Sequence, residues 1–101
     1  MTTNHINPQF PFSLFSLGHI VATPGALDAL QRSKQTPLSF LSRHVSGEWG
    51  DLDEHDRHQN ALALDQGFRL LSSYTTALGE KLWIITEADR SSTTLLLPEE
   101  Y

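Results

Sequence analysis

Cysteine is absent from all 101 residues of this chain. Its absence excludes disulfide bonds, thiolate zinc sites and catalysis by a cysteine nucleophile. It also fits a reducing compartment, and we expect a cytoplasmic protein. The chain has neither a basic N-terminal start nor a long apolar run, so we expect no signal peptide and no membrane association.

Positive charge is also scarce, because 12 acidic residues face 7 basic ones and give a formal net charge of −5. The basic residues are spread along the chain and form no cluster. Because an acidic surface repels the phosphate backbone, we expect no direct nucleic-acid binding. The 6 glycines are isolated from one another, so the chain has no glycine-rich loop that would hold a phosphate group.

The first residues differ in composition from the rest of the chain. Residues 1–14 contain no Lys, Arg, Asp or Glu, and they include prolines together with Phe10 and Phe12. Proline disfavours a helix interior or a central strand here, so we predict an extended N-terminal arm. Free ends usually fray, but two phenylalanines favour docking on the domain or on a neighbouring molecule. The rest, residues 15–101, suits a single domain with one modest core.

Helix and strand signals begin after the arm. Strand-forming residues predict a first strand over residues 15–22, in which Gly18 weakens the strand or marks a bulge. Thr-Pro pairs begin at Thr23 and Thr36. They predict two helix starts, because threonine caps a helix and proline fits its first position. In the second helix we expect an apolar stripe that begins at Leu38.

A third helix is predicted after an acidic loop. Asp51 and Glu54 have the spacing of a capping box at its start. Ala61 and Leu64 are its clearest inward positions, because they lie on one helical face. Gly67 is typical of a helix C-terminus and is expected to end it.

Residues 68–101 predict three short strands joined by two tight turns, near Gly79 and Asp89. Short hairpin connections make neighbouring strands antiparallel. The order strand, three helices, three strands indicates an α+β fold. We therefore predict one antiparallel sheet of three to four strands with about three helices packed on one face. The sequence leaves open where the first strand joins this sheet.

The middle closing strand has an apolar pattern on both faces. Leu82 and Ile84 alternate with Trp83 and Ile85, so one pair is expected to face the helices and the other to point away. An exposed apolar patch indicates a binding partner, and the arm can add its phenylalanines to that surface. The predicted partner-binding residues are Phe10, Phe12, Trp83 and Ile85.

The two tryptophans are expected to differ in their contribution to stability. Trp83 lies on a predicted central strand, whereas Trp49 lies in a predicted loop. Removing a large aromatic side chain from a core costs roughly 3 to 5 kcal/mol. We therefore expect Trp83→Ala to cost more than Trp49→Ala.

No metal site is expected. The acidic segment from Glu48 to Asp56 lacks the alternating ligands of a calcium loop, and helix capping accounts for most of its acids. His55 and His58 lie on adjacent helical turns, but only His44 could supply a third imidazole and the His-Glu-x-x-His order is missing. We predict neither a metal nor a cofactor.

A polar set remains that an enzyme could use for acid–base chemistry or for holding an anion. Its members are Trp49, Asp56, Asn60, Glu87 and Arg90. Each also has a structural interpretation, which we favour. Glu87 and Arg90 fit a polar hairpin turn, and a buried Asn60 would tie the loop around Trp49 to the third helix.

Several strings resemble a known family, namely Ser46-Gly-Glu-Trp-Gly-Asp-Leu52, then Asp56 and Asn60, then Leu82-Trp-Ile-Ile-Thr-Glu-Ala-Asp-Arg-Ser91 and Thr93-Thr-Leu-Leu-Leu-Pro98. The chain resembles small uncharacterised proteins encoded on bacterial plasmids, integrative elements and phages. The resemblance covers about residues 15–101. It implies a bacterial host and a mobile-element setting, and it implies no activity or catalytic residues.

Three functions remain open at this point. The first is a non-enzymatic protein-interaction module, as a homodimer or with a host or element-encoded protein, which the apolar strand face supports. The second is an acidic inhibitor of a host defence or nucleic-acid-binding complex, which would use the segment from Glu48 to Asp56; it rests on the setting alone. The third is a small enzyme that uses the polar set.

Overall fold

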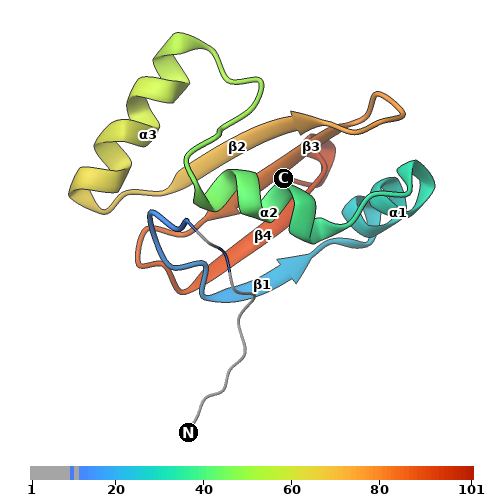
Figure 1. The fold of residues 1–101 in the computed structure, drawn as a ribbon, viewed down its shortest axis with the longest axis horizontal. Helices are drawn as coiled ribbons and strands as arrows, with labels where there is room; N and C mark the ends of the chain where they lie inside the picture. The colour runs from blue at the N-terminus through green and yellow to red at the C-terminus, as the bar shows by residue number, and fades with distance from the viewer. Residues whose placement is uncertain (1–9, 11) are drawn as a thin grey trace, which may run out of the picture.

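The computed structural model describes residue 10 and residues 12–101, and it shows an α+β fold, as predicted (Figure 1). The elements in chain order are β1 (His19–Ala22), α1 (Pro24–Ser33), α2 (Pro37–Val45), α3 (Glu54–Gln66), β2 (Leu70–Thr75), β3 (Lys81–Thr86), β4 (Ser92–Leu96) and the short 3₁₀ helix η1 (Pro98–Glu100). Helix α2 crosses one face of the sheet, and α3 lies beside the strand β2 (Figure 1). No helix in the described part of the chain is long and apolar enough to span a membrane.

The four strands form one sheet in the order β1-β4-β3-β2. The pairs β2–β3 and β3–β4 are antiparallel, as the short hairpins predict. Strand β1 pairs with β4 in parallel, so the sheet is mixed and β1 forms one edge. A parallel pair needs a long crossover, and here all three helices and two strands lie between its members.

Strand β1 is shorter than the predicted range 15–22. It begins at His19 because Gly18 has a φ of 63°, outside the extended region. A Cβ atom at Gly18 would also clash with the backbone carbonyls of the β3–β4 turn. Phe15 and Leu17 precede this kink and pack against the core instead.

The helix starts agree only in part with the sequence signals. Thr23 caps α1, because its hydroxyl accepts a hydrogen bond from the Ala26 amide at 3.2 Å. The expected capping box of Asp51 and Glu54 is wrong, since α3 begins at Glu54 and Asp53 is its cap, accepting from an amide at 2.8 Å. Asp51 instead accepts a hydrogen bond from the Thr75 hydroxyl at 2.8 Å.

Two inward positions were also predicted wrongly. Leu38 is half exposed, and α2 packs through the buried residues Phe40, Leu41, His44 and Val45. On α3, Ala61 is exposed and Asn60 and Ala63 are buried. The reason is that α3 rests beside the sheet edge through one narrow stripe, so most of its surface faces water.

The main core fills the space between the sheet and helices α1 and α2. Its fully buried strand residues include Tyr74, Leu82, Ile84 and Leu95. Trp49 belongs to a second buried cluster and is only 7% exposed, whereas Trp83 is half-buried on the opposite sheet face. Burial therefore favours the opposite order from the one expected, with Trp49 contributing more to stability, because Trp49 packs in a buried cluster with Ala63 and Leu70.

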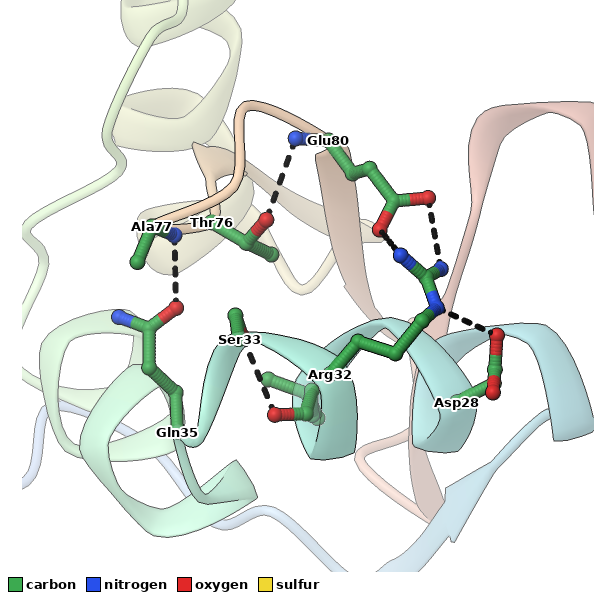
Figure 2. Close-up of polar contacts among 8 residues, drawn as sticks. Asp28, Arg32, Ser33, Gln35, Thr76, Ala77 and Glu80 are labelled. Atoms are coloured by element: carbon green, nitrogen blue, oxygen red, sulfur yellow. Dashed lines mark hydrogen bonds and ion pairs between the residues drawn. The ribbon is translucent and has the colours of Figure 1, made fainter.

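The β2–β3 turn is fastened to α1 by polar contacts (Figure 2). The Arg32 guanidinium lies between Asp28, at 2.8 Å, and the Glu80 carboxylate, which it meets through Nη1–Oε1 at 2.6 Å and Nη2–Oε2 at 2.9 Å. The side-chain carbonyl of Gln35 accepts a hydrogen bond from the Ala77 amide at 2.8 Å. These contacts are exposed and contribute little each, but together they fix the position of the turn.

Candidate functional site

A buried chain of hydrogen bonds links α2 to three strands. His44 lies between Ser72 of β2, with Nδ1 to Oγ at 2.5 Å, and Thr86 of β3, with Nε2 to Oγ1 at 2.9 Å. The Thr86 hydroxyl meets the Thr93 hydroxyl of β4 at 2.7 Å, and Thr93 donates to the Leu17 carbonyl at 2.7 Å. The four polar side chains are fully buried.

The final carbonyl fixes the direction of the bonds from Thr93 back to Nε2 of His44. Because Thr93 gives its proton to a carbonyl, it accepts from Thr86, and Thr86 in turn accepts from Nε2–H of His44. Burial, and next to it the nearby Arg90 charge, lowers the His44 pKa to about 3, so the imidazole is neutral at ordinary pH. With its proton on Nε2, Nδ1 of the neutral ring accepts from Ser72.

This buried set has the residue types of a nucleophile–base pair, but its position does not suit catalysis. Ser72 and His44 are fully buried, so a substrate could not reach the serine oxygen. The rings of Phe15 and Trp49 pack edge-on against the imidazole, at centroid distances of 5.2 and 5.7 Å. The hydrogen bonds of His44 therefore hold α2 against the sheet.

Arg90 clamps the turn between β3 and β4. It has a φ of 62°, a left-handed conformation that is uncommon for arginine. Its Nη1 donates to the carbonyls of Phe68, Glu87 and Ala88, at 2.6 to 3.2 Å, and Nη2 donates to that of Ala63 at 3.0 Å. These donors are therefore used to join the turn to α3, not to hold an anion.

Asn60 makes a different tie from the expected one. Its side-chain amide donates to the Leu71 carbonyl at 2.7 Å and accepts from the Leu71 amide at 3.1 Å, so it fastens α3 to the edge of β2. The tie between α3 and the loop around Trp49 comes from Arg57, which donates to the carbonyls of Gly50 and Leu52 at 2.8 and 3.1 Å. The prediction that Asn60 is buried and hydrogen-bonded is confirmed, but the sequence did not show which residue it binds.

The other members of the polar set do not join Arg90 in one site. Glu87 pairs with Arg69 at 3.4 Å on the side of the sheet away from α2. Asp56 is the first-turn residue of α3 whose amide is capped by Asp53. His55 and His58 are exposed on α3, whereas His44 is fully buried. Within the described residues, no cluster of His, Asp and Glu could hold a metal ion.

The sheet face opposite α1 and α2 carries the second candidate, which we call the far face. Cross-strand pairing places Trp83 beside Leu96 and Ser73, and Ile85 beside Leu71 and Thr94. Leu82 and Ile84 are buried under the helices, so the alternation on β3 is as predicted. Ile85, however, is only 6% exposed, and Trp83 is the larger exposed apolar group of β3.

Tyr101 completes the far face. Its ring packs edge-on against Trp83 at 6.0 Å, and it is 71% exposed. Arg69 donates to its hydroxyl at 2.6 Å and stacks 5.9 Å from the ring centre. Neither Tyr101 nor Arg69 was predicted as a binding residue, since neither lies near Trp83 in the chain.

Glu100 explains why Tyr101 reaches that position. Its carboxylate accepts from the Thr23 hydroxyl at 2.5 Å, the Leu97 amide at 2.9 Å and the Gly25 amide at 3.0 Å. A carboxylate at the first turn of α1 is also favoured by the helix dipole. The hydrogen bonds lower the Glu100 pKa, the largest effect being that of Thr23. The segment after β4 is therefore anchored, and it holds Tyr101 against the sheet.

Phe10 and Phe12 lie on the other side of the molecule. With Ser42 and Arg43 of α2, and Ser46 at its C-cap, they line an open hollow of about 260 Å³. Phe10 also packs against the main core, so these two phenylalanines do not extend the surface around Trp83, in contrast to the prediction. The remaining arm residues, 1–9 and 11, lie outside the described part of the chain.

Comparison with known proteins adds no relative. No protein-family model matches the chain, and no curated protein or solved structure is similar to it.

Proposed function

We propose that the chain is a non-enzymatic protein-interaction module that binds a partner protein through the far face. The observation that carries this proposal is the cluster of Trp83, Tyr101 and Arg69 on the sheet face opposite α1 and α2. Tryptophan, tyrosine and arginine are the residue types that most often dominate binding energy at protein interfaces.

The rim of this cluster also suits a binding surface. Arg69 and Glu87 are both about half exposed, so they can re-pair with charges on a partner. Ile85 and Leu96, on the same sheet face as Trp83, are buried. A rigid apolar centre with a polar rim is the usual anatomy of a specific interface.

The partner is proposed from the setting that the family resemblance implies. We infer a cytoplasmic bacterial protein, encoded by the host or by the mobile element itself, or a second copy of this chain. An acidic domain with scattered basic residues favours a protein over a nucleic acid.

The two other functions have less support from the contacts. An acidic mimic of nucleic acid needs free carboxylates, but Glu48 pairs with Arg43 at 2.7 Å and Asp51 lies 3.4 Å from Lys81. An enzyme needs its polar groups to converge, and those of Asn60 and Arg90 are engaged with backbone groups.

Affinity capture from a bacterial lysate, followed by reconstitution with the purified partner, tests the proposal. Tyr101→Ala should weaken the reconstituted complex at least about tenfold, as truncating an interface hot spot does. Leu78→Ala is the matched control, because Leu78 is 61% exposed on the β2–β3 turn, outside the far face. Equal affinity of wild type and Tyr101→Ala, or a wild type that captures no specific partner, would contradict the proposal.

A further inference from the structure

Within residues 12–101, no hydrogen bond reaches the backbone groups on the outer side of β1. The His19 and Thr23 amides each donate to a β4-side carbonyl at 3.0 Å, of Ser91 and Leu95 respectively. Backbone groups alternate in direction along a strand. Those of Ile20 and Ala22 therefore point away from β4, and β1 is an edge of the sheet. In Figure 1 the described chain places no strand or helix beyond this edge.

At the opposite edge of the sheet, the outward backbone groups of β2 are hydrogen-bonded to other parts of the chain. There, the Ser73 amide donates to the Trp49 carbonyl at 3.0 Å, and the Ser73 carbonyl accepts from the Asp51 amide at 2.6 Å. Asn60 satisfies the next backbone position, at Leu71. Proteins usually protect an edge in this way, or with lysine, proline or a bulge inside the strand, and β1 contains none of these residues.

The segment of sequence that contains β1 carries no charged residue. From residue 10 to residue 27 the sequence holds no Asp, Glu, Lys or Arg, although the whole chain carries a net charge of −5. Several of its large apolar side chains are exposed, namely Phe12, Leu14, Val21 and Leu27. A two-fold interface brings the same surface patch of both copies together, so an uncharged edge avoids the repulsion between like charges that an acidic patch would cause.

We propose that β1 is a homodimerisation edge, at which two copies pair antiparallel to form one continuous sheet. The outward groups match when Ile20 lies opposite Ala22 of the second copy, so that both pairs exchange their backbone hydrogen bonds. Val21 then lies on the two-fold axis next to its own copy, where its side chain, now 49% exposed, becomes covered.

The ends of β1 limit the pairing to this short stretch. Gly18 leaves the extended conformation, and Pro24 has no amide to donate. A strand of 4 residues buries less surface than the roughly 1,200 Å² of a standard interface. We therefore expect a concentration-dependent dimer. A two-fold axis perpendicular to the sheet leaves both far faces on the same side, so dimerisation stands apart from far-face binding and does not rest on it.

Sedimentation velocity over a wide concentration range tests the proposal with an edge variant. Wild type should shift from the 11.3 kDa monomer toward twice that mass as its concentration rises. Ala22→Pro removes an outward amide while leaving the β4 pairing intact, and it should raise the dimer Kd at least about tenfold. Ala22→Val is the matched control: it keeps the amide and should dimerise like wild type.

A second pair of variants covers the case in which Ala22→Pro fails to fold by circular dichroism. Val21→Lys places like charges on the two-fold axis and should also abolish the dimer, whereas Leu78→Lys makes the same change on the β2–β3 turn and should not. A wild type that stays monomeric, or a folded Val21→Lys that dimerises normally, overturns the proposal. Loss of the dimer in Tyr101→Ala would also overturn it, since that result would place the dimer contact on the far face.

Discussion

Mild acid should destabilise this fold through His44. The imidazole is fully buried between α2 and the sheet, with Phe15 and Trp49 against its edges. Burial, and next to it the charge of Arg90, lowers its pKa to about 3 from the ordinary value of 6.5. Below pH 6.5 the unfolded chain binds a proton that the folded chain does not bind until about pH 3. The stability contributed by the neutral imidazole is therefore lost as the pH falls through this window.

The size of the effect follows from the width of the window. Each pH unit is worth about 1.36 kcal/mol once the imidazole of the unfolded chain is protonated. Between about pH 6.5 and pH 4.5 the free energy of unfolding should fall by about 2.5 kcal/mol. Domains of this size are stable by only about 5 to 15 kcal/mol, so the loss is large. Hydrogen bonds lower the pKa values of Asp51, Asp89 and Glu100, so these carboxylates also lose stability as the pH falls.

Urea unfolding followed by tryptophan fluorescence, at several pH values in this range, measures the effect. His44→Gln keeps a donor and an acceptor but cannot titrate, so its stability should depend much less on pH than that of wild type. His55→Gln removes an exposed histidine and should retain the wild-type dependence. If His44→Gln and wild type lose stability equally, the burial argument is refuted. Nitrogen chemical shifts of the imidazole should independently show the Nε2–H tautomer.

Three further substitutions test the packing. Trp49→Ala should cost roughly 3 to 5 kcal/mol in urea melts, and the half-buried Trp83 should cost less; the reverse order would contradict the assignment of Trp49 to the core. Asn60→Ala should cost about 2 kcal/mol, because it leaves edge backbone groups of β2 unpaired, whereas Gln59→Ala, an exposed neighbour, should stay within about 0.5 kcal/mol. Arg90→Lys keeps the charge and the left-handed backbone but loses the fork of donors, so thermal melts should show about 1 to 3 kcal/mol of destabilisation; an unchanged melt would mean that the clamp contributes nothing.

The sequence alone was sufficient for those features that depend on near neighbours. The order of helices and strands, the helix cap at Thr23 and the turn at Gly79 each follow from a few adjacent residues, and all are present in the structure. The two-residue alternation on β3 also placed Trp83 and Ile84 on opposite faces. Local backbone preferences decide such features before any tertiary contact is made.

Tertiary structure decided the features that join distant segments. The edge position of β1, its parallel pairing with β4 and the burial of Trp49 depend on how the elements pack, and no local signal encodes them. His44 meets Thr86 across 42 positions of sequence, and Glu100 meets Thr23 across 77.

The candidate surfaces divide in the same way. Trp83 was readable as an outward aromatic side chain, but Tyr101 and Arg69 join it only because the segment after β4 folds back and is anchored by Glu100. The two edge strands of the sheet, β1 and β2, could be identified only from the tertiary strand order. A sequence pattern states which residues prefer a surface or a core, whereas the set of side chains that meet there is fixed by long-range packing.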